Sequence, residues 1–273
     1  MNIELISMIV LAIVQGITEF LPVSSSGHLV LGGAILGVGG SGENVLFEVA
    51  VHAGTLGAVI VYYGKRLASL ARSLLTWIGS GFRAEGPVRG DVVYIGLIAL
   101  GSIPAAVVGL SLRDSLTATF GSPVLASACL VATGLFLLLS RGRSGGSAIT
   151  WKIAILIGIA QAVAILPGCS RSGWTITTAL ICGLGFSAAA EYSFLLSIPA
   201  ILGALLLESI SAGAGLGGGE IAVLVASAAV AFASGYAALR LLVWILGRGR
   251  FHRFSWYLIP AGTAFLIWFA VRG

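Results

Sequence analysis

The chain has 273 residues, of which 58% are hydrophobic and only 9% are charged, and its mean hydropathy is +1.07. This composition excludes an ordinary soluble domain and is typical of a polytopic membrane protein. The net charge of +5 does not indicate nucleic-acid binding, because the basic residues lie in short segments between apolar stretches.

Apolar segments follow one another along the chain, and their lengths separate them into two kinds. A membrane crossing needs about 20 residues. Six segments are long enough and are predicted to be full spans: 45–63, 91–112, 122–140, 188–208, 220–246 and 253–271. The segments at 27–37 and 173–183 are too short. We expect each to return with the segment before it, 3–21 or 150–166, as a re-entrant helix-loop-helix hairpin.

The predicted fold is therefore an all-α polytopic membrane protein with six transmembrane helices and two re-entrant hairpins. It forms one integral membrane domain over 1–273. The N-terminus carries Glu4 and no basic region, so we expect no cleaved signal peptide.

The distribution of basic residues supports this topology. When the loop 65–89 is placed in the cytoplasm, 12 of the 15 Lys and Arg residues fall on that side, as the positive-inside rule requires. They are Lys65, Arg66, Arg72, Arg83, Arg89, Arg141, Arg143, Lys152, Arg240, Arg248, Arg250 and Arg253. If 150–183 crossed the membrane, Arg248, Arg250 and Arg253 would move outside, so charge supports the second hairpin. The first is inferred from symmetry.

The first hairpin breaks at Pro22 and continues as a polar run to His28. Gln15 and Glu19 share the helix face that points toward this break. A carboxylate in hydrocarbon is costly, so Glu19 is a candidate general base, metal ligand or orienter of a hydroxyl. The alternative is that it caps free N–H groups or reaches an interface.

The run itself contains Ser24, Ser25, Ser26, Gly27 and His28. Ser25 is a candidate nucleophile if a base lies near it. The helix is expected to start near Gly27, which makes Ser26 the favoured N-cap. His28 is a candidate acid, base or nucleophile, although a lone histidine in apolar surroundings is often a packing residue.

The second hairpin breaks at the run 167–173, which contains Arg171 between Ser170 and Ser172, with Thr175 one turn later. Hydroxyls, free backbone N–H groups and a fixed guanidinium together suit a phosphate. The alternative for Arg171 is a structural ion pair with Glu19 or Glu191.

The two halves repeat the order hairpin, span, span, span, over about 1–140 and 150–273. Because three spans per repeat is an odd number, the halves must have inverted topology. The two breaks then meet near the midplane and form one site. Each half also carries a glutamate early in the next span, Glu48 or Glu191. Glu48 and His52 are one turn apart and either line the site or hold the hairpins in place.

The three cysteines, Cys129, Cys169 and Cys182, lie in apolar context without metal-ligand spacing. We expect them to be reduced packing residues.

The run QGITEFLPVSSSGH at 15–28, followed by LPGCSRSGWT at 166–175, resembles the undecaprenyl-diphosphate phosphatase family of the bacitracin-resistance type. That family carries an (E/Q)xxxE motif, a PVSSxGH run and a PGxSRSxxT motif in this order. The segments FEVAVHAGT and AAEYSFLLSIPA extend the resemblance over essentially the whole chain. Gln15 stands where many members have a second glutamate and cannot ionise.

The resemblance implies a membrane hydrolase that removes the terminal phosphate of a C55 polyprenyl diphosphate. This recycles the carrier lipid for cell-wall polysaccharide synthesis and confers bacitracin resistance. It also implies a divalent cation, Mg²⁺ or Ca²⁺, and a site in the cytoplasmic membrane that opens to the outer face. Functional positions carry over to Gln15, Glu19, Ser25, His28, Ser170 and Arg171.

We therefore expect Glu19, Ser25, His28 and Arg171 to be catalytic, with Glu19 also a metal ligand. The expected substrate-binding residues are Gln15, Ser24, Ser26, Gly27, Ser170, Ser172 and Thr175. The nucleophile is left open between serine, histidine and water, and a homodimer is left open.

The main alternative function is a polyprenyl-phosphate transporter or flippase, since inverted repeats with broken helices are transporter architecture. The type-2 phosphatidic acid phosphatase pattern fits less well, because no KxxxxxxRP motif precedes the SSSGH run. In addition, no histidine follows Arg171 before His252.

Overall fold

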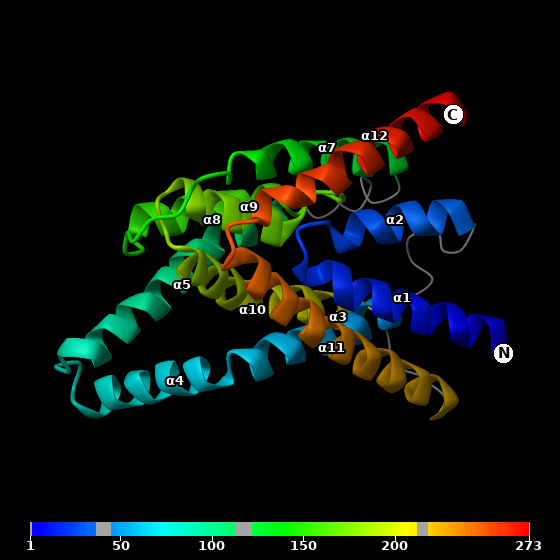
Figure 1. Ribbon diagram of the computed structural model, residues 1–273. Coiled ribbons are helices and arrows are strands. Elements are labelled where there is room, and N and C mark those ends of the chain that lie inside the picture. The colour runs from blue at the N-terminus through cyan, green and yellow to red at the C-terminus, as the bar shows by residue number, and fades with distance from the viewer. Residues whose placement is uncertain (1, 37–44, 113–121, 212–217, 273) are drawn as a thin grey trace.

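The computed structural model describes residues 2–36, 45–112, 122–211 and 218–272, and the regular elements in these ranges are all helices. In chain order they are α1 (Asn2–Phe20), α2 (Ser25–Leu36), α3 (Val45–Tyr62), α4 (Gly64–Gly79), α5 (Gly86–Ser111), α7 (Pro123–Leu138), α8 (Trp151–Val163), α9 (Arg171–Ile181), α10 (Phe186–Ser211), α11 (Gly218–Leu246), the 3₁₀ helix η1 (Phe251–Phe254) and α12 (Ser255–Arg272) (Figure 1).

Five helices in the described ranges are long and apolar enough to cross a membrane. They cover Val45–Tyr62, Gly86–Ser111, Phe186–Leu207, Glu220–Leu246 and Phe251–Val271. Each matches a predicted span, so the all-helical multi-pass fold is confirmed. The segment predicted at 122–140 forms α7, which is apolar but has only 16 residues. The arrangement of six spans plus two hairpins therefore stays a prediction.

Helices α1, α2, α8 and α9 form two antiparallel pairs that enter from opposite ends of the bundle (Figure 1). The pair α1–α2 starts and finishes at the end where both chain termini lie. The pair α8–α9 starts and finishes nearer the other end, to which α4 and α5 also extend. The two turns consequently meet in the interior.

Helix α4 was not predicted, because its residues were assigned to the cytoplasmic loop 65–89. Its apolar residues recur at Leu67, Leu70 and Leu74, which share one face of a helix. Asp91 of α5 accepts hydrogen bonds from Ser73 at 2.7 Å and from Arg66 at 2.7 Å. Because α4 is amphipathic and not uniformly apolar, its sequence does not predict a membrane span. Its charged residues favour assignment to a loop instead.

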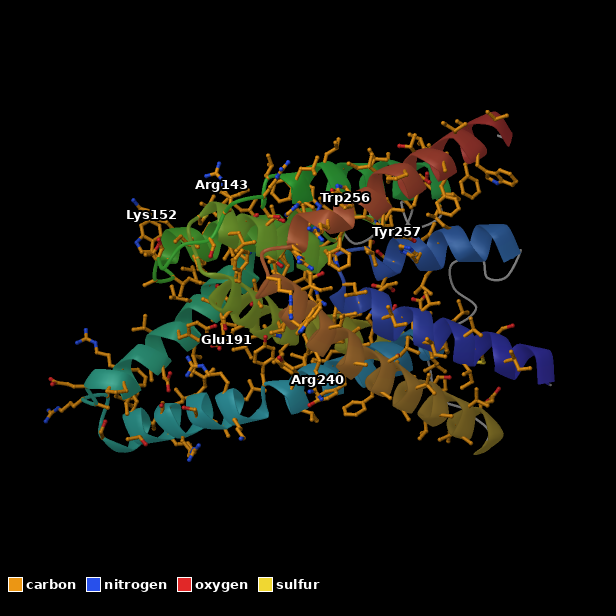
Figure 2. The ribbon with its side chains drawn as sticks, in the orientation of Figure 1. Arg143, Lys152, Glu191, Arg240, Trp256 and Tyr257 are labelled. Atoms are coloured by element: carbon orange, nitrogen blue, oxygen red, sulfur yellow. The ribbon has the colours of Figure 1, made fainter. Side chains whose placement is uncertain are left out.

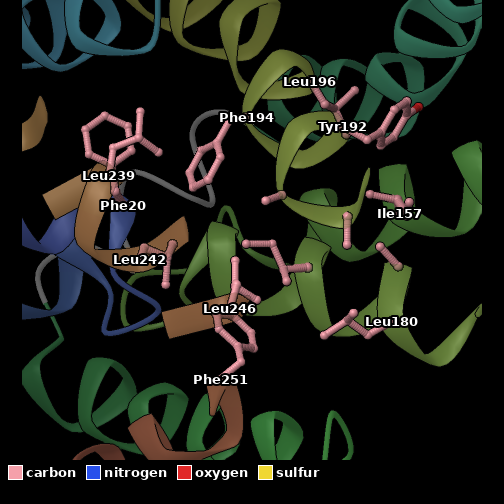
Figure 3. Packing of buried hydrophobic residues seen from close by; sticks show 14 of the residues in the cluster. Phe20, Ile157, Leu180, Tyr192, Phe194, Leu196, Leu239, Leu242, Leu246 and Phe251 are labelled. Atoms are coloured by element: carbon pink, nitrogen blue, oxygen red, sulfur yellow. The ribbon is translucent and has the colours of Figure 1, made fainter. Parts of the chain in front are cut away.

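The apolar core anchors the end of α1 just before its break. Phe20 is fully buried and meets the Phe194 ring of α10 edge-on, with ring centroids 5.8 Å apart. Figure 3 shows Phe20 beside Leu239, with Leu242 of the same helix, α11, close by. Cys129, Cys169 and Cys182 are free thiols, as expected.

The first break is a tight turn between Leu21 and Ser24. The Val23 N–H donates to the Leu21 carbonyl at 2.7 Å, and Pro22 has no N–H with which to continue the helix. Ser24 adopts φ +70°, a left-handed conformation that costs energy for a residue other than glycine.

The second break depends on Gly168, whose φ is +89°. A Cβ at this position would lie 2.1 Å from the Ala126 carbonyl oxygen of α7. The two breaks also touch each other, because a Cβ on Gly27 would lie 2.9 Å from the Gly168 Cα. Only glycines allow the two backbones to approach this closely.

We predict that Gly168→Ala destabilises the protein through both its backbone angle and its contact. Gly142→Ala is the matched control, because Gly142 has φ +69° but no atom within 4 Å of its Cβ position. The control should lose about 1–2 kcal/mol of unfolding free energy, and Gly168→Ala about 1–3 kcal/mol more. Thermal unfolding in detergent measures both, and equal shifts would contradict the packing argument.

Candidate active site

The Glu19 carboxylate is the centre of the site and is only 8% exposed. Its Oε1 accepts a hydrogen bond from Arg171 Nη2 at 2.6 Å. Its Oε2 accepts one from Ser25 Oγ at 2.7 Å and one from Gln15 Nε2 at 3.0 Å. The structure thus brings together four predicted residues, three from the first hairpin and one from the second.

Arg171 is the only cation bonded to this carboxylate among the described residues, and its side chain is 17% exposed. Of the two partners considered for Arg171, the structure therefore selects Glu19. Glu191 pairs instead with Arg66 at 3.0 Å, and Arg66 also binds Asp91. That second network joins α10 to α4 and α5.

The prediction that Ser26 is the N-cap of α2 was wrong. The helix begins at Ser25, two residues before the expected start, and Ser24 Oγ accepts the hydrogen bond from Gly27 N at 3.2 Å. Ser26 Oγ lies 3.3 Å from Ser24 Oγ. The left-handed φ angle at Ser24 ends the turn there. Helix α2 consequently starts two residues earlier than the polar run predicts.

Helix α9 begins with the same arrangement. Ser170 Oγ accepts from Gly173 N at 3.2 Å, and Ser172 Oγ lies 3.2 Å from Ser170 Oγ. Ser24, Ser26 and Gly27 of the first hairpin thus correspond to Ser170, Ser172 and Gly173 of the second.

In this correspondence Ser25 and Arg171 are each the first residue of their helix, and both reach Glu19. The starts of α2 and α9 therefore converge on one carboxylate. Helix N-termini present backbone N–H groups without intrahelical partners and carry partial positive charge. The arrangement attracts an anion as well as holding Glu19.

Thr133 of α7 supports the second break and was missed by the sequence analysis. Its hydroxyl accepts from Ser170 N at 3.3 Å and from Trp174 Nε1 at 3.2 Å, and donates to Gly168 O at 3.4 Å. No pattern could have singled it out, because it is one of several small polar residues in apolar helices.

His28 lies in the first turn of α2 but is not bonded to Glu19. Its Nδ1 is 2.7 Å from the Ser24 carbonyl oxygen, and its Nε2 is 2.7 Å from the Tyr257 hydroxyl of α12. His52 bonds through Nδ1 to the Glu48 carbonyl at 2.8 Å, and it interacts electrostatically with Glu19.

Thr175, predicted to bind substrate, is not placed with these groups. It is fully buried, and its hydroxyl contacts Ser193 Oγ at 2.6 Å and the Arg171 carbonyl at 2.7 Å. These contacts fix α9 against α10. Thr175 therefore stabilises the position of α9 and does not contact the Glu19 carboxylate.

The oxygens near Glu19 fit a divalent cation only together with a ligand. The described residues contain no group of three His, Cys, Asp or Glu side chains that could hold a metal. Gln15 Oε1, however, is buried without a hydrogen-bond partner in the described part of the chain. Mg²⁺ is commonly held by one or two protein oxygens and the substrate phosphates, so Gln15 Oε1 and Glu19 fit this mode.

Fold and site define an all-helical, multi-pass membrane protein with a partly buried group of Ser25, Glu19 and Arg171 (the serine–carboxylate–arginine group) where two helix pairs break. A family model described as "Bacitracin resistance protein BacA" matches residues 8–264. The chain belongs to this family.

Relatives of nearly equal length agree with this assignment. A protein of Rhodopirellula baltica is 41% identical over 95% of this chain and 96% of its own length. One of Desulforapulum autotrophicum is 41% identical over 97% of this chain and 98% of its own length, and one of Korarchaeum cryptofilum is 40% identical over 96% and 98%. All three carry the name "Undecaprenyl-diphosphatase".

We predict strong energetic coupling between Glu19 and Arg171. Removing one partner of a buried ion pair leaves an uncompensated charge and costs about 3–5 kcal/mol. Arg171→Gln should therefore be more destabilising alone than in combination with Glu19→Gln. A double-mutant cycle of thermal stability in detergent should give a coupling free energy of about 1–3 kcal/mol, whereas additive effects would contradict the pairing.

Proposed function

We propose that this protein hydrolyses undecaprenyl diphosphate to undecaprenyl phosphate and inorganic phosphate. The observation that carries the proposal is the hydrogen bond of 2.7 Å from Ser25 Oγ to Glu19 Oε2, beside a fixed guanidinium. A hydroxyl bonded to a base is the geometry of an activated nucleophile. The family and the names of the full-length relatives point to the same substrate.

The diphosphate binds where the starts of α2 and α9 converge. Arg171 takes a bidentate grip on phosphate oxygens, and the backbone N–H groups of the two helix starts add to the positive field. The hydroxyls of Ser24, Ser26, Ser170 and Ser172, with Gly27, line this position. The polyprenyl tail leaves between helices into the bilayer.

Ser25 Oγ attacks the terminal phosphorus while Glu19 accepts its proton. The bond from that phosphorus to the bridging oxygen breaks, and His28 gives a proton to the departing lipid phosphate. A water molecule then gives a proton to His28 and attacks the phosphoserine, which releases inorganic phosphate, and the proton held by Glu19 returns to Ser25. Ser25 is preferred to His28 as nucleophile because only the serine is bonded to a carboxylate.

Gln15 Oε1 and Glu19 would hold a divalent cation, Mg²⁺ or Ca²⁺, together with the substrate. Such an ion would neutralise charge on the transferring phosphoryl group. Because Gln15 cannot ionise, Glu19 supplies the only carboxylate at this position. Glu19 would therefore both bind the cation and accept the Ser25 proton.

The membrane arrangement that we propose is six transmembrane helices and two re-entrant hairpins, in inverted repeats over about 1–140 and 150–273. The packing supports it, because helices of one half make contacts that match those of their counterparts in the other half. Helix α1 packs on α11, and its counterpart α8 packs on α5. Likewise α3 packs on α11 as α10 packs on α5, and the contacts α3–α10 and α7–α12 each join corresponding helices of the two halves.

The protein lies in the cytoplasmic membrane with its site open to the outer face. Arg143 and Lys152 lie on the side of the bundle toward which α4 and α5 extend (Figure 2), and the positive-inside rule places this side in the cytoplasm. Hydrolysis on the outer face would recycle the carrier lipid for cell-wall synthesis and confer bacitracin resistance, in keeping with the family.

We predict that Arg171→Ala and Glu19→Ala lower phosphate release from C55 diphosphate in detergent by a factor of about 10²–10³, the loss usual for a group that stabilises transition-state charge. Chelator should abolish the wild-type rate, and Mg²⁺ or Ca²⁺ should restore it. Arg66→Ala is the control, because Arg66 is also ion-paired but binds Asp91 and Glu191.

Arg66→Ala should keep most of the rate. An equal loss in Arg66→Ala would mean that the assay reports folding and not chemistry. No release from a folded wild type would refute the hydrolase and favour a transporter.

The covalent route predicts that ³²P from substrate labelled in its terminal phosphate is trapped on the protein after an acid quench. Ser25→Ala should lose both the label and the turnover. Ser102→Ala is the control, since its hydroxyl donates to the Ile98 carbonyl within α5. Full turnover in Ser25→Ala would exclude serine as the nucleophile.

A further inference from the structure

Both ring nitrogens of His28 are engaged, and one of them fixes the tautomer. Nδ1 lies 2.7 Å from the Ser24 carbonyl oxygen, and a carbonyl only accepts. Nδ1 therefore carries a proton in the neutral ring and in the charged ring alike. Every proton that His28 gains or gives must consequently pass through Nε2.

Nε2 meets Tyr257, a residue 229 positions later in the chain, with its hydroxyl oxygen 2.7 Å away. The two rings are nearly parallel, with an interplanar angle of 17°. A phenol both donates and accepts. Its hydroxyl donates to Nε2 of neutral His28 and accepts from Nε2–H of the charged ring, so it satisfies the nitrogen in both states.

The position of Tyr257 is set by packing that is independent of His28. Its neighbour Leu258 is fully buried, and a Cβ on Gly134 of α7 would lie 3.0 Å from the Leu258 Cβ. Helix α7 packs against both α12 and α2, so it holds the tyrosine and the histidine in register. Figure 2 shows Tyr257 at the side of α12 toward the start of α2.

Tyr257 is 47% exposed and lies in the first turn of α12. Among the described residues, no side chain of the serine–carboxylate–arginine group is hydrogen-bonded to Nε2.

We propose that Tyr257 is a positioning residue of the active site that acts through His28. It holds the ring so that Nε2 is oriented for proton transfer. Its hydrogen bond to Nε2 breaks when Nε2 gives its proton to the departing phosphate oxygen. The inference rests on the proposed phosphatase function. It assigns a role to α12, the last helix of the chain, which lies outside both motifs.

The kinetic test compares wild type with Tyr257→Phe, which keeps the ring and removes the hydroxyl. We expect kcat for phosphate release to fall on the order of tenfold, about 1.4 kcal/mol. KM should stay unchanged, because Arg171 and the helix starts bind the diphosphate. Tyr192→Phe is the control, since it loses an equally short hydrogen bond, 2.7 Å to the Leu97 carbonyl, without touching His28.

The structural test is ¹⁵N NMR of histidine-labelled protein in detergent. The chain has only three histidines, so His28→Gln assigns the His28 signals. In its neutral form the wild-type ring should show the Nδ1–H tautomer with a hydrogen-bonded Nε2. The Nε2 resonance should move in Tyr257→Phe and stay in place in Tyr192→Phe.

A moved Nε2 signal with a lowered kcat and an unchanged KM supports the proposal. An unmoved Nε2 signal overturns it, as does a moved signal with full kcat, or equal loss in Tyr192→Phe. A wild type that releases no phosphate refutes the proposed function instead, and the NMR comparison then still decides whether Tyr257 holds His28.

Discussion

The ion pair between Glu19 and Arg171 is the constraint on which the rest of the site depends. Each charge alone in a membrane interior is expensive, and a buried charge is tolerated only when its partner and further hydrogen bonds are in place. Because the partners are 152 residues apart, they can meet only if both helix breaks reach the same point. Gly27 and Gly168 are required for the same reason, since their backbones approach too closely for a side chain.

The same pair explains how a site so polar can be stable before substrate arrives. In the resting structure Arg171 neutralises Glu19, while Ser25 and Gln15 complete the carboxylate's hydrogen bonds. A diphosphate would offer Arg171 oxygens of higher charge than the carboxylate. In the proposed mechanism Arg171 turns toward the phosphate, and Glu19 is then free to accept the Ser25 proton. The mechanism therefore couples substrate binding to activation of the nucleophile through one guanidinium.

The sequence predicts those parts of the molecule that are governed by local cost. Apolar length located the five helices able to span a membrane, and the expense of intramembrane charge identified Glu19 and Arg171. The N-cap of α2 was missed because the left-handed angle at Ser24 comes from the tertiary turn and not from local preference. Helix α4 was hidden by its charged face. The contact of Tyr257 with His28 joins residues 229 apart and leaves no periodic signal.

The two helix starts show how one capping pattern serves two chemical purposes. Ser24 and Ser170 cap their helices with the same hydrogen bond, and each is followed by a serine and a glycine at the same spacing. The backbones reach this cap differently, because Ser24 has φ +70° and Ser170 has φ −76°. The first helical residue also differs, and Ser25 and Arg171 bond to opposite oxygens of Glu19. Two helix starts with one cap thus form an asymmetric site, which in the proposed mechanism has a nucleophile on one side and an anion-binding group on the other.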